Sequence, residues 1–110
     1  MNEYAIYQVH DGLIREWGFS SLERLRRDHP DRLGLPREVW REVYRFRTKD
    51  ARSLDWIFQW LNGPKRPDSY EGRSMSVGDI VETPDGRLWY CDSFGWQRVR
   101  WSPEEETDGA

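Results

Sequence analysis

The alternation of hydrophobic and polar positions is clearest towards the C-terminus, within residues 72–101. Three short runs there are rich in β-forming residues and predict antiparallel strands at 80–83, 88–92 and 96–101. The sequences Pro-Asp-Gly and Asp-Ser-Phe-Gly lie between these runs, and these residue types favour tight turns. The pattern therefore predicts a three-stranded meander around which the rest of the chain is organised.

A further strand is predicted near the N-terminus. Residues 4–9 consist mostly of β-forming residues and end at the turn signal His-Asp-Gly. Residues 13–19 fit either a second short strand or an irregular approach to the next helix.

The run 39–48 predicts another strand, because its side chains alternate with a period of two. Phe46 faces one way, while Arg45 and Arg47 face the other. We therefore expect this strand to present an exposed arginine face.

The first predicted helix begins at Ser20. This serine stands three residues before Glu23, which is the spacing of a capping box. The helix is expected to extend to about Arg27 and to place only Leu22 and Leu25 against the core.

The second predicted helix has Ser53 as its N-cap. Its end is marked by Asn-Gly-Pro at 62–64, and the glycine is expected to take the left-handed conformation. Apolar residues at helical spacing form a single stripe that predicts burial along one side: Leu54, Ile57, Phe58 and Leu61.

Together these elements predict an α+β fold, an antiparallel sheet with a C-terminal three-stranded meander and two helices packed on one face. The length of 110 residues fits one domain. We expect this domain to span residues 1–102, and residues 103–110 to form a disordered acidic tail.

Composition narrows the class of protein. Charged residues make up 34% of the chain, but 15% are aromatic and seven are tryptophans, which favours a folded domain with a small core rich in rings. One cysteine and two histidines provide no disulfide framework and no plausible zinc set, so no metal or cofactor is predicted. No apolar run is long enough to cross a bilayer and no signal pattern is present, so the protein is expected to be cytoplasmic.

The net charge of −3 hides an uneven distribution of charge. Residues 20–66 contain twelve Lys and Arg residues against seven Asp and Glu residues, whereas residues 104–108 carry four acidic side chains. The basic segment is suited to phosphate or to an acidic partner surface. The alternative is an ordinary solvated face of mixed charge.

Candidate catalytic groups are few. Asp92 and Ser93 are adjacent, and their side chains are expected to cap backbone donors of the turn. The side chains of Ser74, Ser76 and Asp79 are expected to do the same around the Val-Gly pair. Cys91 alternates with apolar residues, which favours a buried and unreactive thiol. The two histidines, 10 and 29, are expected to face solvent, and no catalytic residue is predicted.

Aromatic residues interleaved with arginine are the stronger functional signal. Such residues dominate protein interfaces, and they also stack bases and contact phosphates in single-strand binders. Trp96 and Trp60 are expected to be the first tryptophans left partly exposed. The candidate binding residues are Trp60, Arg45, Arg47, Phe94, Trp96, Arg98 and Arg100.

The chain also resembles a known family. The runs GRSMSVGDIV at 72–81 and WYCDSFGW at 89–96 are similar to the two signature segments of the YodL-like domain, and shorter similarities begin at residue 4. The family is found in bacterial mobile elements, chiefly conjugative elements, alone or inside larger polyvalent proteins.

The resemblance implies a small non-enzymatic accessory protein of a mobile element or phage. We expect it to bind a host or defence-system protein, as an anti-CRISPR or antirestriction-type inhibitor does. The alternatives are a module that binds single-stranded nucleic acid through its arginine and aromatic faces, and a small hydrolase built around Asp92 and Ser93.

Overall fold

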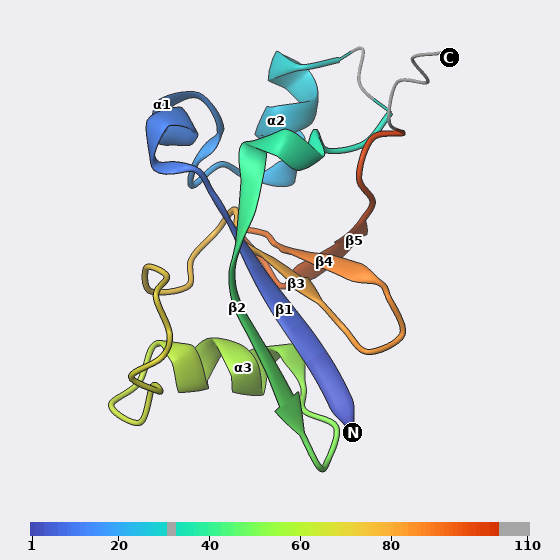
Figure 1. The fold of residues 1–110 in the computed structure, drawn as a ribbon. Coiled ribbons are helices and arrows are strands. Elements are labelled where there is room, and N and C mark those ends of the chain that lie inside the picture. The colour runs from blue at the N-terminus through green and yellow to red at the C-terminus, as the bar shows by residue number, and fades with distance from the viewer. Residues whose placement is uncertain (31–32, 104–110) are drawn as a thin grey trace.

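The computed structural model describes residues 1–30 and 33–103. The fold is α+β, with a five-stranded antiparallel sheet in the order β2-β1-β3-β4-β5 (Figure 1). The strands are β1 (Asn2–Val9), β2 (Trp40–Thr48), β3 (Ile80–Glu82), β4 (Leu88–Cys91) and β5 (Trp96–Val99).

Helical segments connect the strands on the N-terminal side of the meander. They are η1 (Asp11–Leu13), α1 (Ile14–Trp17), α2 (Leu22–Asp28), η2 (Arg37–Val39) and α3 (Leu54–Leu61). Among the described segments, no helix is long and apolar enough to span a membrane.

The predicted meander is confirmed as β3, β4 and β5. Its two turns use glycine in the positive-φ conformation, as predicted: Gly86 has a φ of 84° and Gly95 a φ of 77°. The predicted tail at 103–110 lies, apart from Pro103, outside the described residues.

The N-terminal strand β1 lies inside the sheet, between the edge strand β2 and the middle strand β3. It pairs with β2 along its whole length, and Ile6 opposes Val81 of β3 on the other side. The register with β2 shifts between Ile6 and Tyr7, where Val43 is the extra residue of a bulge. This central strand is buried on both faces from Tyr4 onwards.

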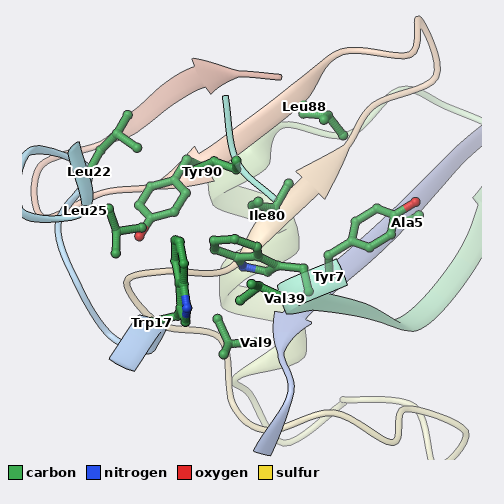
Figure 2. Close-up of a cluster of buried hydrophobic side chains, with 12 residues drawn as sticks. Ala5, Tyr7, Val9, Trp17, Leu22, Leu25, Val39, Ile80, Leu88 and Tyr90 are labelled. Carbon is green, nitrogen blue, oxygen red and sulfur yellow. The ribbon is translucent and has the colours of Figure 1, made fainter. Parts of the chain in front are cut away.

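Two hydrophobic clusters cover the two faces of the sheet. Ala5 and Tyr7 of β1 point into the first, together with α2 (Figure 2). Tyr4 and Ile6 point into the second, together with Ile57 of α3. The helices therefore pack on the sheet, as expected, but each has its own face rather than sharing one, because β1 is apolar on both sides.

The first long helix starts one residue later than predicted. Ser21 is its N-cap, with the amide of Arg24 donating to Ser21 Oγ at 3.2 Å. Ser20 is buried instead, and its carbonyl accepts a 2.5 Å hydrogen bond from the Tyr90 hydroxyl. This contact with β4 decides which of the two serines caps the helix.

Residues 13–19 form neither of the predicted structures. They contain the end of η1 and the single turn of α1, which buries Trp17. The Trp17 ring packs edge-on against Trp40 at 6.0 Å between centroids, and this long-range contact places the helical turn.

The helix α3 begins as predicted, with the Trp56 amide donating to Ser53 Oγ at 3.0 Å. Its end differs, because Gly63 does not have a positive φ. The Asn62 side chain instead pairs with the backbone of Met75, donating to its carbonyl at 2.9 Å and accepting from its amide at 2.5 Å. This amide pair fastens the end of α3 to the segment that leads into β3.

Candidate functional site

A buried carboxyl group lies at the entrance to β3. Asp79 Oδ2 accepts hydrogen bonds from Gln8 Nε2 at 3.0 Å and from the Ser76 amide at 2.9 Å. Burial raises the pKa of Asp79 to about 7, and the hydrogen bonds and the nearby Arg73 only partly oppose this rise. The predicted turn-capping role is confirmed for Asp79 but not for the Ser76 hydroxyl, which is buried and has no partner in the described part of the chain.

The same network continues through Gln8 to the segment before β3. Gln8 Oε1 accepts from the Arg73 amide at 2.9 Å, and the Tyr70 hydroxyl donates to the Arg73 carbonyl at 2.6 Å. The Arg73 guanidinium reaches Asp11 at 2.7 Å. These bonds hold residues 70–79 against β1, so we interpret the network as a structural clamp.

The Asp92 carboxylate also accepts hydrogen bonds from backbone amides. Its Oδ1 accepts from the Ser93 amide at 2.8 Å, as predicted, and from the Leu22 amide at 3.1 Å. The second bond ties the first residue of α2 to the turn before β5. Cys91 is buried as predicted, and burial raises the pKa of its thiol to about 11, which keeps it neutral.

The histidines differ from each other. His10 is exposed, as predicted, but His29 is half-buried. The His29 ring stacks on Trp17 with 3.9 Å between centroids, and its Nε2 is buried without a hydrogen-bond partner among the described residues. The prediction that His29 faces solvent is therefore wrong, because the Trp17 ring covers one face of the imidazole.

The predicted binding residues do not form one site. Arg45 and Arg47 lie on β2, whereas Arg98 and Arg100 lie on or just after β5, at the opposite edge of the sheet. Arg45 is paired with Glu42 at 2.8 Å and with Glu3 at 3.0 Å, and Arg47 approaches Glu3 at 3.7 Å. The arginine face of β2 is thus largely neutralised by its own sheet.

The predicted aromatic residues are also separated. Trp60 packs against Phe46 at 5.0 Å between centroids, and Trp96 donates from Nε1 to Asp55 at 3.0 Å. Both tryptophans stay partly exposed, but Trp56, which is 36% exposed, is more accessible than either. Phe94 projects from the β4–β5 turn and is 92% exposed.

The structure brings Arg98 and Arg100 to a pocket between α2 and β5, with a volume of about 450 Å³. Its apolar lining consists of Trp17, Leu22, Leu25, Leu33, Leu35 and Val99. Its polar lining consists of Arg26, His29, Arg98 and Arg100.

One wall of this pocket depends on a close backbone approach. The Leu35 amide donates to the Arg100 carbonyl at 3.0 Å, and the Ser102 amide donates to the Leu35 carbonyl at 2.8 Å. A side chain on Gly34 would place its Cβ 2.8 Å from the Arg100 carbonyl oxygen. Glycine at this position therefore allows the loop after α2 to close against the chain that follows β5.

Among the described residues, the lining of the pocket contains arginines and a histidine but no acidic residue. Arg26 and Arg98 form no ion pair within the described ranges, and the Nε of Arg100 donates to the Leu33 carbonyl at 3.3 Å. No group of three or more potential metal ligands is found in the part of the chain that the structure describes. Such a site favours an apolar group that carries a negative charge.

Sequence reasoning identified Arg98 and Arg100 but missed the other side of the pocket. Arg26, His29 and Leu33 come from a segment far away in the chain. The cluster of arginines near residue 26 was visible in the sequence, but nothing local indicated that it would face β5.

Comparison with known proteins gives a family match. The model of a family described as YodL-like domain matches residues 3–101, which include β2 to β5, all of β1 except Asn2, and the residues that line the pocket. The searches of curated proteins and of solved structures gave no match.

Proposed function

Because the chain belongs to the YodL-like domain family, we propose that it is a small accessory protein of a bacterial mobile element or phage that binds a host or defence-system protein. In this proposal it acts in the cytoplasm by occupying its partner and not by catalysis. Inhibition of an immune or restriction system, as by an anti-CRISPR or antirestriction protein, is one form of this activity.

The observation that carries the proposal is a set of exposed side chains along the β5 edge. We call Leu33, Phe94, Arg98 and Arg100 the β5 surface. Phe94 and Leu33 are 92% and 72% exposed, so two large apolar side chains face solvent. Leu33 lines the same pocket as Arg98 and Arg100, and neither arginine forms an ion pair within the described ranges. Large exposed apolar groups and arginines are enriched where proteins meet.

The size of the molecule is compatible with such contact. A standard interface buries about 800 Å² on each partner, and the whole accessible surface is 7189 Å². A partner covering the β5 surface and its surroundings would thus leave most of the molecule free. To inhibit the partner by occupying it, the protein needs only to cover a region that the partner requires for its own activity.

Affinity capture from host cells tests the proposal. Wild-type protein is expected to recover a defined partner, and recovery is expected to fall with Phe94→Ala and with Arg98→Glu. Arg41→Glu is the matched control, because Arg41 is an exposed arginine on β2 at the other edge of the sheet.

The captured partner is then purified and mixed with each variant. Equal binding by Phe94→Ala, Arg98→Glu and wild type would remove the β5 surface from the interaction. Failure of the wild type to bind any purified candidate would contradict the proposed function itself.

A second candidate function is supported by a separate row of rings on α3. Trp56 stacks on Trp60 at 5.1 Å between centroids, and the guanidinium of Arg52 lies 4.4 Å from the Trp56 ring centre. A half-exposed tryptophan beside an arginine is a platform on which a base can stack. This alternative predicts binding of single-stranded oligonucleotides that weakens steeply with salt and with Trp56→Ala; no binding at low salt would end it.

A further inference from the structure

We propose that the pocket between α2 and β5 receives an acidic and hydrophobic segment of the partner protein, with one large apolar side chain inside and carboxylates at the rim. This inference rests on the proposed function and specifies the chemistry of the partner. It is carried by three properties of the described pocket lining, which are its apolar floor, its arginines and a buried histidine nitrogen that has no partner among residues 1–30 and 33–103.

The floor selects an apolar side chain. Leu22, Leu25 and Leu35 are buried core residues whose surfaces continue into the pocket. Leu33 stands at the same pocket but is mostly exposed, so it is available to cover a group that enters. The volume of about 450 Å³ lies within the range of pockets that hold small ligands, and it accepts a leucine or an aromatic ring.

The rim selects negative charge. Arg26 comes from α2, and Arg100 follows β5, where its Nε donates to the Leu33 carbonyl at 3.3 Å, so a cation stands on each side of the pocket. Within residues 1–30 and 33–103, no acidic side chain lines the pocket to neutralise them. Guanidinium groups bind carboxylates through two parallel hydrogen bonds, and aspartate or glutamate beside the inserted side chain would supply these acceptors.

His29 provides a further polar contact. Its ring is fixed by stacking on Trp17, and its Nε2 is buried with no hydrogen-bond partner in the described ranges. Buried polar atoms in native proteins are nearly always satisfied, so an unsatisfied one in a pocket wall is a place where a bound group is expected. A carboxylate or backbone group of the partner would satisfy it.

These features favour a peptide segment over nucleic acid. A strand of nucleic acid needs a continuous polar track for its phosphates and open rings for its bases. In this pocket the arginines surround buried leucines, and the Trp17 ring is buried and already stacked on His29.

The direct test is fluorescence anisotropy with defined probes. The first probe is a fluorescein-labelled peptide that carries Leu-Phe between two Asp-Glu pairs. In the second, lysines replace the acidic residues; in the third, glycines replace Leu-Phe; the fourth probe is an oligothymidine strand. Circular dichroism and urea unfolding establish that each variant is folded.

We expect wild type to bind the first probe and to bind the other three at least about tenfold more weakly. Arg26→Glu and Arg100→Glu should each weaken binding of the first probe about tenfold or more, whereas Arg41→Glu should leave it unchanged. No binding of the first probe, equal binding of the lysine probe, preference for oligothymidine, or equal binding by folded Arg26→Glu would each overturn the inference.

Competition distinguishes this inference from the proposed function. If a purified partner stays bound when the first probe saturates the pocket, the pocket assignment is wrong while partner binding stands. If the probe binds with the expected dependence on Arg26 and Arg100 but no host protein is captured, the pocket assignment stands and the proposed function is wrong.

Discussion

Replacing Asp79 with asparagine should remove a source of instability at neutral pH. Asp79 is only 3% exposed, and burial raises its pKa from 3.8 to about 7. In the unfolded chain the same carboxyl group ionises near its ordinary value. Between about pH 4 and pH 7 the folded protein therefore holds a proton that the unfolded chain has released, and the free energy of unfolding falls as pH rises.

The size of the effect follows from the pKa difference. The folded and unfolded values differ by roughly three units, and each unit corresponds to about 1.4 kcal/mol, so roughly 4 kcal/mol is lost by neutral pH. This is a large fraction of the stability of a typical domain, about 5 to 15 kcal/mol. Asparagine cannot ionise, and its amide oxygen can take the place of Oδ2, which accepts from Gln8 and Ser76.

The assay is urea unfolding followed by tryptophan fluorescence at several values between about pH 5 and pH 8. The stability of Asp79→Asn relative to wild type should increase through this range and level off above about pH 7. Parallel pH dependences for the two proteins would refute the reasoning, because they would mean that Asp79 is charged in the folded state.

Asp85→Asn is the control for this experiment. Asp85 is exposed on the β3–β4 turn, and hydrogen bonds from Thr83 at 2.6 Å and from the Arg87 amide at 3.1 Å lower its pKa. Stability gained from a lowered pKa is present at neutral pH and is lost only as pH falls below the ordinary range of aspartate. The difference between this variant and wild type should therefore be constant from about pH 5 to pH 8.

Three further predictions concern the backbone at Gly34 and Phe19 and the thiol of Cys91. Gly34→Ala should destabilise the protein by about 1 to 3 kcal/mol in urea unfolding, since its Cβ would meet the Arg100 carbonyl oxygen at 2.8 Å; unchanged stability would show that this wall is loose. Phe19→Gly should stabilise the protein by about 1 kcal/mol in the same assay, because Phe19 has a φ of 54° and its side chain is 54% exposed. A decrease in stability would mean that the contacts of the ring outweigh the backbone strain. Cys91, whose pKa is raised to about 11, should react with a disulfide reagent only after denaturation, and rapid labelling of native protein would contradict its burial.

The elements that the sequence predicted best are those defined by local chemistry. In α3 a serine cap and an apolar stripe lie within the same few residues. The cap is found as expected, and of the stripe Ile57 and Leu61 are buried while Leu54 and Phe58 are partly buried against the same cluster. The meander is equally local, because each strand is joined to the next by a turn whose glycine takes positive φ. In contrast, α1 depends on the packing of Trp17 against Trp40, and no pattern within residues 11–17 reports that contact.

The candidate site was predictable only in part for the same reason. Arg98 and Arg100 stood out beside aromatic residues, but their pocket needs Arg26 from a helix far away in sequence. Arg45 looked equally promising, yet its acidic partner Glu3 lies on the neighbouring strand, a relationship that only the strand register reveals. Which cation is free and which is neutralised is therefore a property of the tertiary fold.

The position of β1 has a consequence for how the chain is made. Of the strands in this sheet β1 is synthesised first, yet Ile6 must wait for Val81 before its second edge is paired. Until then β1, whose residues from Tyr4 onwards are buried on both faces in the folded protein, has an unpaired edge that can associate with other unfolded chains. Contacts so distant along the chain slow folding, so synthesis of this protein should benefit from holdase chaperones and from growth at reduced temperature.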